Sequence, residues 1–265
     1  MKRKSFLLTV VFASFFTIAG AVAQQKVKTK QQPPTGGSKT AKTKAVDGKA
    51  KTKKSTGKFP SPSDSKKYKL KQLFKGAKLW IDQQRKIVVI EGQVVLRGGP
   101  LEMFACPKGT KEHESVVALE CQGFHVHAGL LAVGAKSGSP VSFRPKYKQA
   151  SGTPVDILVL WVDKNGKKRR INAKEWVYNI DSKKELDKTW VFAGSKFWTD
   201  PKTKRRYYQG DSGDLICVSN FPTATLDLPI KSTQANEGLL FHANTKKIPA
   251  LGTKVRLVLV PRLKK

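Results

Sequence analysis

Acidic residues are scarce in this chain. Its 265 residues include 19 Asp and Glu against 51 Lys and Arg, which gives a formal net charge of +32 at pH 7. An imbalance of this size is extreme for a soluble domain, and it attracts anionic partners to the protein surface. The composition therefore disfavours cationic partners and indicates anionic ones.

Residues that build common cofactor sites are also few. The chain has three cysteines and four histidines, with no Cys-x-x-Cys pair, no His-Glu-x-x-His motif and no glycine-rich phosphate loop. Three cysteines alone do not ligate a standard iron–sulfur cluster. Zinc-finger spacing and the aromatic signature of RNA-binding domains are missing as well. We therefore predict no cofactor, no metal and no specific nucleic-acid partner.

An uncharged apolar run lies near the N-terminus. Three basic residues at positions 2–4 precede the apolar residues 6–23, which end in Ala-Val-Ala. This order is typical of a secretory signal peptide cleaved after residue 23. An uncleaved N-terminal membrane anchor is the alternative, because 18 residues are at the lower limit of a spanning helix. We expect an exported protein of the periplasm or cell envelope.

Large apolar residues are rare in residues 24–65. Eleven lysines stand there against two acidic residues, in repeated Lys-Thr pieces of low complexity. Such a segment cannot bury enough surface to offset chain entropy, so we expect a disordered Lys/Thr-rich linker. Residues 66–265, with 37 basic and 17 acidic residues, are long enough for a single folded domain.

Apolar residues in the folded part recur at the short spacing of β-strands. Two hairpins are predicted, one over residues 154–173 with its turn at Asp163–Gly166 and one over residues 190–209 with its turn at Asp200. Gly92 is interpreted as a bulge or bend within a strand. Further strands are predicted over residues 78–82, 86–97, 100–105, 114–120, 214–219 and 254–260.

Two segments have features of helices. Residues 233–244 form the weaker candidate, in which Thr233 could act as the N-cap. Residues 123–138 form the stronger one, and a glycine at position 134 or 138 would end it. Its expected buried face consists of Phe124, His127, Leu130, Leu131 and Ala135. We therefore predict a single α+β domain, predominantly antiparallel sheet with one or two short helices.

Gly-Asp-Ser-Gly at residues 210–213 is the tetrapeptide around the nucleophilic serine of trypsin-like proteases. A serine nucleophile needs a histidine base and an acid that orients it. None of the four histidines stands in the Ala-Ala-His-Cys context of those enzymes, and Asp214-Leu215 replaces the Gly-Pro that follows their motif. We interpret Ser212 as part of a turn.

Residues 106–115 form the loop richest in chemically active side chains. Such a polar loop between two apolar strands is a normal position for a binding site, and a solvated hairpin loop is the alternative. With one histidine and one acid from outside the loop, it could supply the site of a metal-dependent or hydrolytic enzyme. The candidate ligand or active-site residues are Lys111, His113, Glu114, Ser115, His127 and Asp214.

His125 and His127 would share a face only in an extended segment, because on a helix they diverge by about 200°. Together with His113 and a carboxylate, one of them could complete a zinc or copper site. The alternative, which needs no metal, is that His127 lies on a helix and lines the core or a polar pocket.

The three cysteines allow one disulfide and one free thiol in an oxidising compartment. Cys106 and Cys121 are a candidate pair, but they face each other only in a hairpin that turns between His113 and Glu114. The third cysteine, Cys217, lies in the apolar run Leu-Ile-Cys-Val and is expected to be buried and inert.

Tryptophans and basic clusters alternate in the second half of the chain. Trp161, Trp176, Trp190 and Trp198 are separated by basic residues at 167–170 and 202–206. Aromatic platforms beside cations could hold sugars or anionic polymers. The alternative is that these tryptophans belong to the core and the cations to a solvated surface.

Five strings occur together in order, at residues 97–119, 127–141, 190–198, 211–230 and 250–261. In these strings the chain resembles the YdjY-domain family of exported bacterial proteins, and the resemblance covers most of residues 78–263. It implies no established activity. Descriptions of one branch as ferredoxin-like do not transfer, because the clustered cysteines are missing here.

The leading functional hypothesis is an exported, non-enzymatic module that binds or organises envelope material. Its basic residues would give weak, salt-sensitive attachment to anionic envelope polymers or to a membrane surface. The alternative is a metal-dependent or hydrolytic enzyme with its site around Lys111, His113 and Glu114.

Overall fold

The computed structural model describes residues 69–232 and 239–263. The predicted signal peptide and the predicted linker over residues 24–65 lie outside the described residues, as does the first half of the helix predicted over residues 233–244. No helix within the described ranges is long and apolar enough to cross a membrane.

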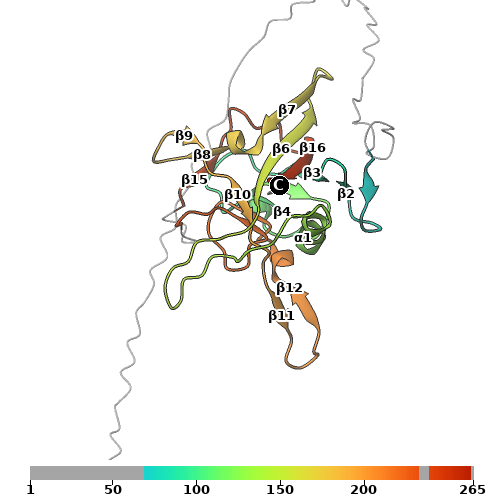
Figure 1. The fold of residues 1–265 in the computed structure, drawn as a ribbon. Coiled ribbons are helices and arrows are strands. Elements are labelled where there is room, and N and C mark those ends of the chain that lie inside the picture. The colour runs from blue at the N-terminus through green and yellow to red at the C-terminus, as the bar shows by residue number, and fades with distance from the viewer. Residues whose placement is uncertain (1–68, 233–238, 264–265) are drawn as a thin grey trace, which may run out of the picture. The chain divides into compact units, whose positions relative to one another are not determined.

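One sheet contains eleven strands, which are β1 (Lys71–Gln72), β2 (Leu79–Asp82), β3 (Ile87–Val94), β4 (Met103–Pro107), β5 (Ser115–Leu119), β6 (Pro154–Val162), β7 (Lys168–Asn172), β10 (Trp190–Phe192), β13 (Ile216–Cys217), β14 (Leu226–Asp227) and β16 (Lys254–Pro261). Eight of them form a closed ring in the order β3, β16, β6, β10, β14, β13, β4, β5, and β5 pairs again with β3. β2 pairs with β3 and β1 with β2, so both continue the sheet outward from β3, and β7 pairs with β6. Figure 1 shows β7 beside β6.

This closed sheet overturns the predicted α+β class. The described chain is mostly β and has one α-helix, α1 (Gly123–Ala132). A sheet that closes on itself buries its own inner face, so it needs no covering layer of helices. The described residues also form three short 3-10 helices, namely η2 (Glu112–Glu114), η3 (Ala173–Trp176) and η4 (Gln209–Ser212).

The second predicted helix is wrong in the part that the structure describes. β15 (Phe241–Ala243) pairs antiparallel with β8 (Val177–Asn179), and β9 (Lys184–Glu185) completes a three-stranded sheet. In β15 the two outer residues are buried and the middle one is half-buried, which is the period of a strand rather than of a helix.

Alternate side chains fill the interior of the closed sheet. Along β6 and β16 every second residue is buried, and Ile157 and Leu257 are fully enclosed. Trp176, Trp190 and Phe104 add large rings to the same cluster, with the Phe104 and Trp190 centroids 5.6 Å apart. The core interpretation is therefore confirmed for these two tryptophans.

Gly92 lies where β3 changes neighbours. Ile90 pairs with Leu79 of β2, whereas Gly92 pairs with Leu119 of β5, and this second pairing closes the ring. A Cβ atom at position 92 would collide with the carbonyl oxygen of Ala118. The close approach of two backbones, rather than a bulge, is the reason for glycine here.

α1 begins at the predicted residue, but its buried face differs from the prediction. Phe124 and Leu131 are exposed, because the buried positions are Val126, Leu130 and the two glycines Gly123 and Gly129. Two glycines therefore allow the helix a close approach to its neighbours, with Gly129 facing Val88 and Leu79 of the sheet and Gly123 facing Gly210 of η4. The prediction is confirmed for Leu130 and Ala135, which are buried. It is wrong for Phe124 and Leu131, because it counted large apolar side chains and gave the glycines no weight.

The second predicted hairpin is shorter than predicted. β11 (Phe197–Thr199) and β12 (Arg206–Tyr208) form a separate two-stranded sheet, whereas residues 190–192 belong to β10 of the closed sheet. Its turn begins at Asp200, as predicted, and the Asp200 carboxylate accepts hydrogen bonds from the backbone N–H groups of Lys202 and Thr203. Figure 1 shows this hairpin projecting away from the closed sheet. Residues 196–208 are called the arm below.

Candidate functional site

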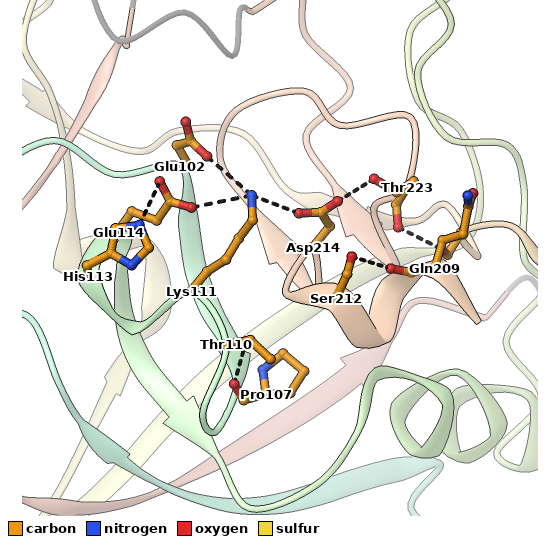
Figure 2. A network of polar contacts seen from close by, with 11 residues as sticks. Glu102, Pro107, Thr110, Lys111, His113, Glu114, Gln209, Ser212, Asp214 and Thr223 are labelled. Carbon is orange, nitrogen blue, oxygen red and sulfur yellow. Dashed lines mark hydrogen bonds and ion pairs between the residues drawn. The ribbon is translucent and has the colours of Figure 1, made fainter. Parts of the chain in front are cut away.

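Lys111 lies at the centre of a group of carboxylates, which Figure 2 shows. Its Nζ is 3.1 Å from Asp214 Oδ1, 3.3 Å from Glu114 Oε1 and 3.5 Å from Glu102 Oε2. The Lys111 side chain is 28% exposed and the carboxylates are 8% to 19% exposed, so the group is largely shielded from solvent but still partly accessible to it. The Phe221 ring centroid lies 4.5 Å from the same ammonium. We call Lys111, Glu102, Glu114 and Asp214 the Lys111 cluster.

The elements around β4 bring this cluster together. Lys111 stands just before η2 in the loop between β4 and β5, and Glu102 just before β4. Asp214 comes just before β13, which pairs with β4. The ion pair of Lys111 with Asp214 therefore connects the loop between β4 and β5 to the segment that precedes β13.

The charges of the cluster hold one another in place. Burial alone would lower the pKa of Lys111, but the neighbouring carboxylates outweigh it and raise the pKa above its ordinary value. Burial and the nearby Glu114 raise the pKa of Glu102. The Thr223 hydroxyl donates a hydrogen bond to Asp214 Oδ2. Lys111 therefore stays charged and engaged, which makes it a poor nucleophile or base.

Only part of the predicted site is assembled in this way. Lys111, Glu114 and Asp214 meet, whereas His113 is 77% exposed and reaches the cluster at its edge, with Nε2 3.8 Å from Glu114 Oε2. Ser115 is fully buried at the start of β5. The sequence prediction missed Glu102, which lies in an apolar strand segment and carries no motif.

His127 lies on α1, away from the Lys111 cluster. Its Nδ1 is 3.0 Å from the hydroxyl of Tyr208, and its ring packs edge-on against Phe192. Burial lowers the pKa of His127 below its ordinary value. His127 therefore lies half-buried on a helix, as the interpretation that needs no metal expected.

His125 has a different role from His127. Its Nδ1 accepts a hydrogen bond from the backbone N–H of Gln122 and caps the start of α1. The two histidines therefore do not converge on a shared ion. Within the described ranges, no group of three or more His, Cys, Asp or Glu residues is arranged to hold a metal ion.

Ser212 occupies a turn, as its neighbours in the sequence indicated. It is the last residue of η4, and its hydroxyl donates a hydrogen bond of 2.7 Å to the backbone oxygen of Gln209. Gly213 follows with φ of 133°, a conformation that favours glycine. The second glycine of the tetrapeptide thus serves the turn.

The structure contains no Cys106–Cys121 disulfide, because all three cysteines are free. β4 and β5 pair in parallel, not as a hairpin, and the register places Cys106 beside Ala118. The hairpin interpretation of the loop at residues 106–115 is therefore wrong. Cys217 is fully buried, as expected.

The arm is a candidate binding surface that the sequence analysis did not include among the candidate site residues. Phe197, Trp198 and Tyr207 are 47%, 47% and 44% exposed, so Trp198 lies outside the core. Within residues 69–232 and 239–263, none of the five arm cations has a carboxylate partner. These cations are Lys196, Lys202, Lys204, Arg205 and Arg206. The signal was the mixture of aromatic and basic residues in residues 196–208.

A cavity of about 860 Å³ lies beside β3, β16 and the end of β6. Its lining mixes cations with carboxylates, and Arg256 pairs there with Glu91 at 2.8 Å. The edge of Trp161 contributes to one wall, although this residue is only 9% exposed. The mixed charges do not define one ligand class.

Fold and site together define a mostly β domain whose closed sheet carries an ion-paired lysine and a projecting basic arm. The chain belongs to the YdjY domain family, whose family model matches residues 79–260. This match confirms the resemblance that was noted in the sequence. No curated protein and no solved structure matches the chain.

Proposed function

We propose that this protein is an exported, non-enzymatic module of the cell envelope that attaches to anionic polymers through its surface cations. The observation that carries the proposal is the arm, where five cations stand against one acid, Asp200. The Asp200 carboxylate is occupied by backbone N–H groups of its own turn. The arm therefore presents positive charge that the described residues do not neutralise.

The tip of the hairpin between β6 and β7 supports the same proposal. Its residues 163–170 include five cations, of which Arg169 pairs with Asp163 at 2.7 Å. Elsewhere, cations that stabilise the fold are paired, as Lys247 is with Glu175 and Glu185. Cations at projecting turns that no carboxylate neutralises can attract an anionic partner. This electrostatic attraction weakens as salt screens it.

The predicted leader and linker agree with this proposal. A signal peptide over residues 1–23 would place the domain among the anionic polymers of the envelope. The lysines of residues 24–65 would add attachment without a folded site.

The alternative of a metal-dependent or hydrolytic enzyme gains no support from the geometry. In the Lys111 cluster an ammonium group occupies the position between the carboxylates where a metal ion would have to lie. His113 is the one exposed histidine next to the cluster, and it points to its edge. We therefore interpret the cluster as structural.

The test compares the full chain with two variants of equal net charge on envelope preparations at low salt. The first variant, named arm-neutral, replaces Lys196, Lys202, Lys204 and Arg205 with Gln. The second, named paired-neutral, replaces four cations that have carboxylate partners, namely Lys108, Lys188, Lys247 and Arg262, with Gln.

We expect the arm-neutral chain to lose most of its retention and the paired-neutral chain to keep most of it. Deletion of residues 24–65 should weaken retention further, and equal retention without them would remove the linker from the account. Equal loss in the two charge variants would show that net charge alone, and not the arm, governs attachment.

A further inference from the structure

Trp198 is the one tryptophan of the chain with a large exposed surface. It is 47% exposed, whereas the other four tryptophans are between 0% and 9% exposed. The arm does not need its ring for packing, because Tyr208 anchors the base of the arm. The Tyr208 hydroxyl bonds to Gly194 and Thr225, and its ring is buried. An exposed, rigid aromatic group that the fold does not require is a sign of a binding surface.

Trp198 and Tyr207 form one shallow aromatic surface. They stand directly opposite each other on β11 and β12, with ring centroids 5.7 Å apart and ring planes inclined by 32°. The rings thus lie side by side on one face of the hairpin. We call this pair the aromatic platform.

Two cations flank the platform on the same face. The strand pairing continues at both ends, because Gln209 N–H donates to the Lys196 carbonyl and Asp200 N–H donates to the Arg205 carbonyl, each at 2.9 Å. Side chains alternate along a strand, so Lys196 and Arg205 share the face of Trp198 and Tyr207 at a distance of about 7 Å along the strand. This face therefore carries Lys196, then the two aromatic rings of the platform, and then Arg205 along the direction of the strands.

The opposite face of the arm is engaged within the protein. Arg206 lies over the Phe197 ring, 4.5 Å from its centroid, and Phe197 packs edge-on against Tyr208 with centroids 5.3 Å apart. Only the face with the aromatic platform combines exposed rings with cations that lack such contacts. The ligand surface is thus restricted to one face.

We propose that the aromatic platform binds an anionic polysaccharide. The apolar C–H faces of sugar rings would stack on Trp198 and Tyr207, while acidic substituents along the chain pair with Lys196 and Arg205. This proposal rests on the proposed function and names the polymer class that the arm prefers. A polyanion without sugar rings would contact the cations but leave the platform unused. A lipid surface would offer the two aromatic rings no flat sugar face on which to stack.

The test measures binding of the full chain to three probes, which are alginate as a polyuronate, polyphosphate as a polyanion without sugars, and vesicles of phosphatidylglycerol. Trp198→Ala removes half of the platform, and Phe197→Ala is the matched control, since both side chains are 47% exposed on opposite faces of one hairpin. Thermal unfolding of both variants checks that the fold is retained.

We expect Trp198→Ala to bind alginate about tenfold more weakly, the effect of one stacked aromatic contact, and to bind polyphosphate within about twofold of the original chain. Phe197→Ala should change neither affinity by more than about twofold. Tryptophan fluorescence should shift with alginate, and Trp198→Phe should abolish that shift.

Equal effects of the two alanine variants on alginate would overturn the polysaccharide assignment. The same holds for equal losses with alginate and polyphosphate, or for a Trp198 shift that only the vesicles cause. Each of these results would leave the proposed function intact, because the arm cations would still bind polyanions. If the full chain bound none of the probes at low salt, the proposed function itself would fail.

Discussion

At the scale of single residues, Lys111 shows how this protein uses charge inside its fold. One ammonium serves three carboxylates that come from separate segments of the chain. Without the Lys111 ammonium, each carboxylate would be a sheltered charge without its partner. Removal of one partner from such an ion pair is destabilising because it leaves an uncompensated charge. The cluster therefore stabilises the junction of β4, β5 and β13.

Lys111→Met tests this role. We expect the free energy of unfolding to fall by about 2–3 kcal/mol, somewhat below the loss for a fully buried pair, because the lysine is 28% exposed. Lys108→Met is the control, since its pair with Glu120 is more open to solvent, and it should cost less than about 1 kcal/mol. Urea unfolding of both variants measures the difference, and equal losses would refute a special role of Lys111.

Asp227 predicts a pH dependence of stability. Burial raises its pKa from the ordinary 3.8 to about 7 in the folded protein, against the hydrogen bonds from Asn220 and Leu228. Between about pH 4 and pH 7 the folded chain holds a proton that the unfolded chain has lost, so the free energy of unfolding decreases as pH rises through this window.

Asp227→Asn removes that titration. The stability of the original chain relative to this variant should fall by up to about 1.4 kcal/mol per pH unit between pH 4 and pH 7, and then level off. Urea unfolding of both chains at pH 5, 6, 7 and 8 gives the difference. Parallel curves across these pH values would show that Asp227 does not titrate as described.

Part of the cluster could be predicted from sequence because its polar residues stand close together or in a turn. Lys111, Glu114 and Asp214 were named for that reason. Glu102 could not be found, since its role depends on where β4 lies beside the loop. His127 was placed in the candidate group, but its helix carries it to Tyr208 instead.

At the scale of elements, closure of the sheet depends on a backbone contact between β3 and β5. Gly92→Ala would force its new methyl group into the Ala118 carbonyl. We expect a loss of about 1–3 kcal/mol in the free energy of unfolding, as for other overpacked sites. Gly98→Ala is the control, because its nearest atom is the side-chain oxygen of Thr245 at 3.2 Å. A smaller loss at position 92 than at position 98 would contradict this account of closure.

Strands were more predictable than their partners. β6 and β16 alternate buried residues with half-buried ones, and that pattern is visible in the sequence. The parallel pairing of β4 with β5 and the closure of the ring depend on contacts between distant residues, which local periodicity does not encode. For the same reason the α+β class was wrong although most strands were placed correctly.

At the scale of the whole molecule, charge is divided between two uses. Paired cations such as Lys111, Lys247 and Arg262 hold elements together. On the arm and at the tip of the hairpin between β6 and β7, several cations without a carboxylate partner stand close together. The composition predicted an anionic partner, but only the fold could separate the cations that stabilise the protein from those that are free to bind.

The most direct test of this account is the salt dependence of binding to polyphosphate, measured for the full chain, the arm-neutral variant and the paired-neutral variant. Each cation that contacts the polymer adds to the loss of affinity with rising salt, because salt screens that contact. The account predicts a weaker affinity and a shallower salt dependence for the arm-neutral chain than for the paired-neutral chain of equal net charge. Identical affinity and salt dependence in the two variants would contradict it.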